Sequence, residues 1–286
     1  MHNSQIVLRL IFILHFGTLL FHSAYAQCSD AGACSVKLHS SQAGLQIQPT
    51  IEFGQSGKAD DLSFLTLKLF AQYEVVENST VSFAVPFSRV SGPLGSVSGL
   101  GDAIILWDQR FFEEEEREFH VQAGAKVATG AANKGGLPQT YQTGLGTNDM
   151  LLGALYRAED WRFNISYQYS PGRSENSLTR LYRGDDVVAR VERKMQFKPI
   201  EASVSLLAVK RLGISSVRDA LSAAESFVDV AGSDQFQLNL AADLLYPLDT
   251  SKTFVCGLAF PLLKRAVNVD GLTRAFTVSA GVMIGF

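Results

Sequence analysis

The last eleven residues, Phe276–Phe286, constrain the fold more than any other stretch of the chain. Apolar side chains occupy every second position, which places them on one face of a β-strand: Phe276, Val278, Ala280, Val282, Ile284 and Phe286. Thr277, Ser279 and Met283 fall on the other face together with glycines. Soluble proteins blunt an exposed edge strand with charge, proline or a covering element. This bare strand predicts the closing strand of a membrane barrel, apolar toward lipid and polar toward the lumen.

Residues 1–26 have the pattern of a cleaved secretory signal. Arg9 precedes the apolar run Leu10–Phe21, and the small-residue exit Ala24-Tyr25-Ala26 follows it. A membrane anchor is the alternative, but His15 and Gly17 interrupt the run, which falls short of the roughly 20 residues that a spanning helix needs. We therefore predict export and a mature chain that begins at Gln27.

Net charge and cysteine content limit which partners and covalent links the chain can have. The formal net charge is −3, whereas nucleic-acid binding requires a basic surface, so we predict no nucleic-acid partner. Cys28 and Cys34 lie close together in an exported chain and could form a disulfide. Cys256 falls on the apolar face of an alternating stretch, where we interpret it as a small hydrophobic residue.

Alternating segments recur along the rest of the chain, and we count about twelve. Each is long enough to cross a bilayer as a tilted strand, which takes about 9–11 residues. Trp161–Ser170 shows the pattern most clearly, with four aromatic residues and an isoleucine on one face and Arg162, Asn164, Ser166, Gln168 and Ser170 on the other. The predicted strands are Gly44–Gly54, Asp61–Val75, Thr80–Val90, Gly99–Phe112, Glu118–Gly130, Thr147–Ala158, Trp161–Ser170, Asp186–Phe197, Glu201–Leu212, Asp234–Tyr246, Lys252–Leu263 and Leu272–Phe286.

Short and long connections alternate between these segments. Glu159-Asp160 and Lys198-Pro199 are short, whereas Ala131–Gly146 and Gly213–Ser233 are long, and Ser91–Ser98 also belongs to the long set. Outer-membrane barrels show this asymmetry, with short periplasmic turns and longer extracellular loops. A soluble β-sandwich also has many short strands, but it does not account for the asymmetry. We predict an all-β fold: a closed antiparallel transmembrane β-barrel of about 12 strands.

Charged residues should face the lumen, because an Arg or Lys facing lipid at mid-bilayer costs about 2–4 kcal/mol. Arg193 is the exception, near a predicted periplasmic end from which it can reach the lipid headgroups. Pro86 removes a ladder donor, so we expect a bulge or a strand end there. The predicted lumen-lining residues are Lys68, Asp108, Arg110, Lys126, Arg157, Arg162, Arg190, Glu192, Lys194 and Asp243.

Three glycine-containing stretches occur together in the middle of the chain. Gly99–Asp102 leads toward Phe111-Phe112, Gly124–Gly130 follows, and Gly144–Asp149 precedes Gly153 and Tyr156. In this order they resemble the outer-membrane barrel family associated with the meta-cleavage pathway of phenol degradation, although Ala128 stands where that family's pattern has proline. The resemblance implies an outer-membrane barrel that passes small, aromatic or hydrophobic solutes, and it implies no catalytic residues.

Other chemistry has little support in the sequence. The glycines of Gly130–Gly136 and Gly144–Gly146 sit in no strand–loop–helix unit, which argues against a phosphate-binding loop. The mature chain has two histidines, His39 and His120, and both fall at predicted periplasmic positions away from the long loops. Glu113–Glu116 is expected to be a solvated turn, because consecutive carboxylates do not converge on one ion. We predict no catalytic residues, no metal and no cofactor.

Two functions follow from a lumen with nearly balanced charges. The barrel is either a passive channel with a charged constriction, or a barrel filled by its own side chains that acts through its loops. Residues 27–43 form a periplasmic segment or a plug, and residues 44–286 form the barrel. We predict a bacterial outer-membrane location, contact with outer-membrane lipid, and recognition by the barrel-assembly machinery through the strand that ends at Phe286.

Overall fold

The computed structural model describes residues 44–58, 60–222 and 224–286. One antiparallel sheet of thirteen strands dominates it, and twelve of these form the closed wall, because β4 (Gly95–Leu100) only extends β3. Closure comes from the pairing of β15 with β1, which confirms the predicted barrel. The wall strands are β1 (Leu45–Gln55), β2 (Ser63–Val76), β3 (Ser79–Gly92), β5 (Ala103–Glu114), β6 (Arg117–Val127), β7 (Asp149–Ala158), β8 (Trp161–Tyr169), β9 (Asp186–Phe197), β10 (Ile200–Arg211), β13 (Phe236–Pro247), β14 (Lys252–Leu263) and β15 (Phe276–Gly285).

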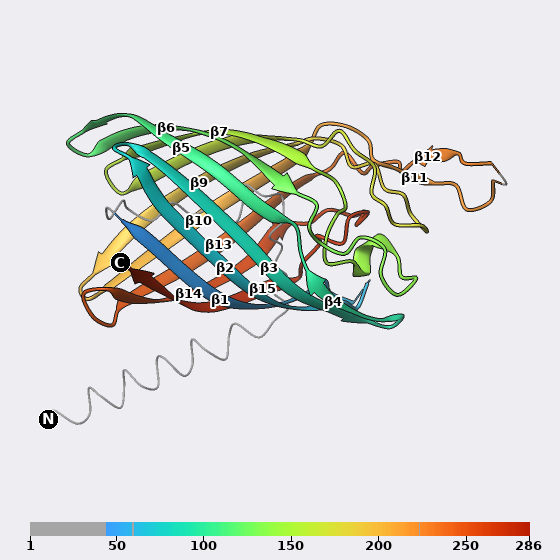
Figure 1. Cartoon of the computed structure of the whole chain (residues 1–286), viewed down its shortest axis with the longest axis horizontal. Helices are drawn as coiled ribbons and strands as arrows, with labels where there is room; N and C mark the ends of the chain where they lie inside the picture. Colours follow the sequence, from blue (N-terminus) through green and yellow to red (C-terminus); the bar gives the residue numbers. More distant parts are fainter. Residues whose placement is uncertain (1–43, 59, 223) are drawn as a thin grey trace, which may run out of the picture.

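The two ends of the barrel differ, as Figure 1 shows. Tight turns such as Glu159-Asp160 join the strands at one end, where β15 also finishes. Long loops gather at the other end, and the β11–β12 hairpin (Ser216–Arg218 with Phe227–Asp229) projects from it. We call these the short-turn end and the long-loop end. The asymmetry agrees with the sequence-based prediction, although residues 213–233 hold a hairpin where the sequence predicted only a loop.

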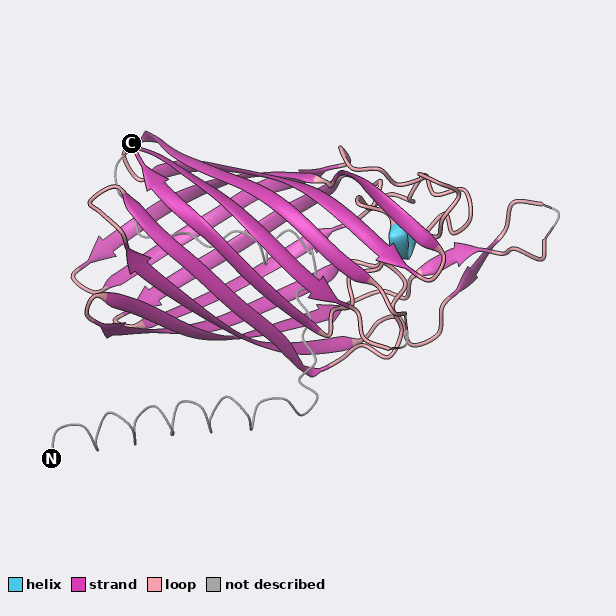
Figure 2. Ribbon diagram, turned by 90° about the horizontal axis from the view of Figure 1, so that it is seen from below, coloured by secondary structure: helices cyan, strands magenta, loops and turns pink. Residues whose placement is uncertain are grey.

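The apolar side of each strand faces outward. In β2, Leu65, Leu67 and Leu69 are 45, 56 and 48% exposed, whereas Phe64 and Phe70 on the other face are buried. Exposed apolar side chains of this kind surround the tilted strands seen in Figure 2. A band of this extent is what a barrel presents to acyl chains. No stretch of the described residues forms a helix long and apolar enough to cross a membrane.

The predicted strand Gly99–Phe112 is wrong, because it is interrupted at Gly101 and Asp102 and its residues belong to two different strands. Gly95–Leu100 folds back on β3 as β4, so that residues 91–98 form a tight hairpin and not the predicted long loop. β5 begins only at Ala103. Between them the Asp102 carboxylate accepts hydrogen bonds from the backbone N–H groups of Gly130 (3.2 Å) and Leu145 (2.7 Å). This long-range contact turns the backbone out of the strand.

Pro86 causes neither of the two irregularities that the sequence predicted. β3 continues to Gly92, and its register with β2 is unbroken where Pro86 faces Lys68. On its other edge β3 pairs with β5 up to Ala84 and with β4 from Phe87. The backbone N and C=O of a strand residue point to the same edge, and the Pro86 carbonyl accepts from that side. Pro86, which has no N–H, therefore lies where the neighbour of β3 changes from β5 to β4. No hydrogen bond of the sheet is lost there.

Candidate functional site in the barrel lumen

The predicted lumen residues lie on the inward face, and the structure divides them between a cavity and a network of ion pairs. Lys68, Lys126, Arg190 and Asp243 line a cavity of about 240 Å³ inside the barrel. The others belong to strands β5–β9 and bond to neighbouring strands or turns. Their part in conduction stays a prediction.

Ion pairs and hydrogen bonds to carboxylates cover the inner wall from β5 to β13. The imidazole Nδ1 of His120 lies 2.7 Å from Asp108 Oδ1, and the Arg190 guanidinium is 2.6 Å from Glu192 and 4.0 Å from Asp243. Each cation here has an anionic neighbour on the same or an adjacent strand, so the wall is polar with balanced charge. The remaining pairs are Arg157–Glu118, Arg162–Glu192, Lys194–Glu201 and Arg110–Glu113. Outside this wall, Lys68 on β2 pairs with Glu52 on the neighbouring strand β1.

An apolar stripe lies beside this wall and overlaps it on β5 and β7. Phe70, Ala84, Ile104, Leu106 and Leu151 form a buried cluster that points inward from β2, β3, β5 and β7. A second cluster lies at the long-loop end and contains Leu62, Phe64, Val90, Val97 and Tyr141. The sequence prediction of a polar lumen missed this stripe. The signal was present in β2, where Phe64 and Phe70 interrupt the strict alternation.

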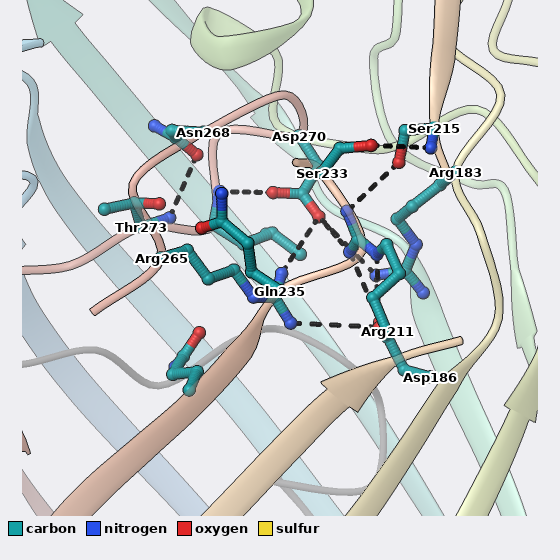
Figure 3. A network of polar contacts seen from close by, with 12 residues as sticks. Arg183, Asp186, Arg211, Ser215, Ser233, Gln235, Arg265, Asn268, Asp270 and Thr273 are labelled. Carbon is teal, nitrogen blue, oxygen red and sulfur yellow. Dashed lines mark hydrogen bonds and ion pairs between the residues drawn. The ribbon is translucent and has the colours of Figure 1, made fainter. Parts of the chain in front are cut away.

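Seven charged side chains meet at the long-loop end of the lumen. We call them the mouth cluster: Lys126, Asp149, Arg183, Asp186, Arg211, Arg265 and Asp270. All of their side chains are at most 3% exposed. The Arg211 guanidinium lies 2.7 Å from Asp270 and 3.2 Å from Asp186, as Figure 3 shows. Of the seven, the sequence had singled out only Lys126.

The mouth cluster joins wall strands to two long loops. Asp149, Asp186 and Arg211 come from the ends of β7, β9 and β10, while Arg183 belongs to the loop 170–185 and Asp270 to the loop 264–275. Charged side chains can be buried away from water only when they pair with opposite charges, as these do with one another. The cluster therefore fixes both loops against the inner wall.

Backbone contacts bring a third loop into the same place. The loop 128–148 contains the short 3-10 turn η2 (Gln139–Tyr141), and a Cβ built on Gly271 would lie 2.7 Å from the Thr140 Cα. The side chain of Asn176 donates to the carbonyls of Ala132 and Leu137, both 2.9 Å away. Loops from three sides of the barrel thus meet and cover the long-loop end of the cavity.

Electrostatics favour the ionised form of Asp270. Burial would raise the pKa of this carboxyl, but the nearby charges of Arg211, Arg265 and Arg183 outweigh burial and hold the pKa below its ordinary value. At Asp102 burial prevails and raises the pKa of the carboxyl, because the nearby charge of Lys126 offsets only part of the effect of burial. Asp270 is therefore a carboxylate across the physiological pH range.

Several other predicted sites have simple environments or lie outside the described residues. Cys28, Cys34 and His39 fall among residues 1–43, as do the signal and the plug-or-tail segment. Cys256 is a free, half-buried cysteine in β14. Glu113–Glu116 forms an exposed strand end and turn. Across residues 44–58, 60–222 and 224–286, no three His, Cys, Asp or Glu side chains are grouped as metal ligands would be.

Comparison with known proteins shows which solved structures have a similar fold. No protein-family model matches the chain, and no curated protein matches it. Among solved structures, an outer membrane channel from Pseudomonas putida F1 superposes with a TM-score of 0.65 at 15% identity, covering 88% of this chain and 100% of that one. The chain is an outer-membrane-type β-barrel.

Two porins are similar at lower scores. The NanC porin has a TM-score of 0.51 at 9% identity and covers 85% of this chain and 100% of that one. The KdgM porin has a TM-score of 0.50 at 8% identity, with 84% and 99% covered. At these identities the likeness establishes the fold alone. The resemblance to the phenol meta-cleavage family therefore rests on short sequence motifs and stays a prediction.

Proposed function

We propose that the protein is a passive channel of the bacterial outer membrane for small solutes that have an apolar face. The observation that carries the proposal is the apolar stripe of the lumen, which lies next to the ion-paired wall. Phe70, Ala84 and Ile104 of the stripe line the cavity, and an apolar solute surface in contact with them would be removed from water. A solute with one apolar and one polar face would contact the stripe and the charged side chains of the cavity together. The similarity in fold to an outer membrane channel and to two porins supports the same function.

The outer surface supports the location. Exposed Leu, Ile, Phe and Trp side chains surround the barrel, so contact with outer-membrane lipid follows from the same energetics that place charges in the lumen. Recognition of the last strand by the barrel-assembly machinery is part of the proposal. β15 pairs with β1 and is followed by Phe286, which is 73% exposed.

A second candidate is a barrel that does not conduct and acts through its long loops. It is favoured by one observation, the mouth cluster, which holds two of those loops over the cavity. Under this function the lumen would stay closed in every condition.

Solute uptake by proteoliposomes tests the channel. Phenylalanine and glutamine are zwitterions of similar size that cross lipid poorly, but only phenylalanine presents an apolar ring. The proposal predicts swelling with both amino acids, several-fold faster with phenylalanine. Equal rates would contradict the role of the apolar stripe. Swelling no faster than that of protein-free liposomes, together with no resolvable current steps in planar bilayers, would contradict the channel itself.

A further inference from the structure

The mouth cluster buries four cations, and the Asp102 carboxyl, which is also buried, acts on one of them, Lys126. Lys126, Arg183, Arg211 and Arg265 supply four positive charges, and Asp149, Asp186 and Asp270 supply three negative ones. All seven side chains are nearly inaccessible to solvent. With Asp102 counted, the charges are balanced, so an incoming anion would have to replace one of these carboxylates and not add to them, because the interior screens charge poorly.

Guanidinium groups in the cluster also lack acceptors. The Nε and Nη1 atoms of Arg183 and the Nε and Nη2 atoms of Arg265 are buried and have no hydrogen-bond partner. Arg183 Nη1 lies 3.3 Å from Asp186 and 3.9 Å from Asp270, and Arg265 Nη2 lies 3.8 Å from Asp186. These are ion-pair distances longer than a good hydrogen bond. A guanidinium group binds a carboxylate best through two parallel N–H···O bonds. The site therefore offers more donors than its own aspartates satisfy.

Asp270 differs from the other two aspartates, because a loop carries it. Asp149 and Asp186 belong to wall strands, whereas Asp270 lies seven positions past the last residue of β14, in the loop 264–275. Its Oδ2 lies 2.7 Å from Arg211, 3.6 Å from Arg265 and 3.9 Å from Arg183. This is the position that the carboxylate of a separate molecule would occupy.

The cluster is reached from the lumen. Asp270 and Lys126 both line the cavity, next to the apolar side chains of Leu145 and Leu272. A solute in the cavity would thus meet the carboxylate position and an apolar surface together.

We propose that the mouth cluster is a carboxylate-binding site, which Asp270 fills in this structure and which the carboxylate of a small solute fills during passage. The inference rests on the proposed channel function and adds a substrate class to it: small solutes with an apolar face and a carboxylate. Replacement of Asp270 by the solute releases the loop 264–275 from Arg211 and from its contact with η2. The binding of the solute then opens the long-loop end of the lumen.

Calorimetric titration of the folded protein in detergent with benzoate tests the site without depending on conductance. Asp270→Asn removes the internal competitor, so benzoate should bind at least tenfold more tightly than to the wild type. Adding Arg265→Gln to that variant removes two of the unsatisfied donors and should weaken binding at least tenfold. Benzamide, the neutral analogue, should show no measurable binding to the wild type or to either variant. The matched control is Asp249→Asn, which changes an exposed ion pair with Lys252 at the short-turn end and should bind benzoate as the wild type does.

Equal benzoate affinity in the wild type and the Asp270→Asn variant would overturn the proposal, as would equal binding of benzamide. If Asp270→Asn fails to fold by heat-shift gel electrophoresis, Arg265→Gln alone in the wild-type background gives the answer, with weaker benzoate binding expected and unchanged binding contradicting the site. A protein that binds benzoate in this pattern but never conducts would retain the site and refute the channel. A protein that conducts but binds benzoate equally in all variants would keep the channel and refute the carboxylate-binding site.

Discussion

Substitution of Lys126 by methionine gives a quantitative test of how the lumen is built. The Lys126 Nζ lies 2.5 Å from the Asp149 carboxylate, and both side chains are buried, at 3% and 0% exposure. Removing one partner of a buried ion pair costs about 3–5 kcal/mol, because the other charge remains without compensation. Arg183 stays 3.5 Å from the same carboxylate, so the loss should lie near the lower limit, at about 3 kcal/mol. That corresponds to a change of roughly 150-fold in the folding equilibrium constant.

Equilibrium unfolding by urea in lipid–detergent micelles measures this loss, with tryptophan fluorescence and heat-shift gels as two probes. A matched control is Lys252→Met, because Lys252 pairs with Asp249 at 3.2 Å while both side chains are about half exposed. An exposed pair contributes about 0–1 kcal/mol. If Lys126→Met loses no more stability than Lys252→Met, the account of the lumen as a buried, charge-paired interior is wrong.

Three further outcomes follow from the structure. Leu69→Arg, on the lipid face within β2, should cost about 2–4 kcal/mol in urea unfolding, and Val76→Arg near the short-turn end only about 0–1; a larger loss at Val76 would contradict the assignment of the faces. The depressed pKa of Asp270 stabilises the folded state above the ordinary value of 3.8, and this contribution disappears as the pH falls through the folded pKa. The melting temperature should therefore be level from pH 8 to 5 and drop below about pH 4, with a smaller drop in Asp270→Asn; an equal drop in both proteins would exclude Asp270 as its source. Gly281→Val should prevent folding on heat-shift gels, because a Cβ at this position would lie 2.5 Å from the Pro49 carbonyl oxygen across the β1–β15 closure, and a normally folded variant would show that the closure is looser.

The barrel itself could be predicted because its signal is local and periodic. Strands such as Trp161–Ser170 alternate cleanly, and each strand contributes the same pattern whatever its partner. The boundaries of the strands were harder. The break at Asp102 depends on hydrogen bonds to Gly130 and Leu145, which no pattern near Asp102 reveals.

The mouth cluster could not be predicted in the same way. Arg183, Arg265 and Asp270 lie in long loops without periodicity, so their sequence context shows only charge in a polar segment. Their meeting depends on three loops folding inward, which the backbone contact between Gly271 and Thr140 illustrates. A partial signal did exist. Asp186 and Arg211 stand at the long-loop ends of paired strands, where oppositely charged residues on one face indicate an ion pair.

The most direct test of the central claim, that the apolar outer face contacts lipid, uses the two tryptophans of the chain. Trp107 lies within β5 and is 42% exposed, whereas Trp161 is the first residue of β8 at the short-turn end and is 41% exposed. In liposomes of brominated lipids, Trp107 in the Trp161→Phe variant should be quenched most by bromines deep in the acyl chains. Trp161 in the Trp107→Phe variant should be quenched most by bromines near the headgroups. Fluorescence that no brominated lipid quenches, but that aqueous acrylamide quenches at both positions, would contradict the account.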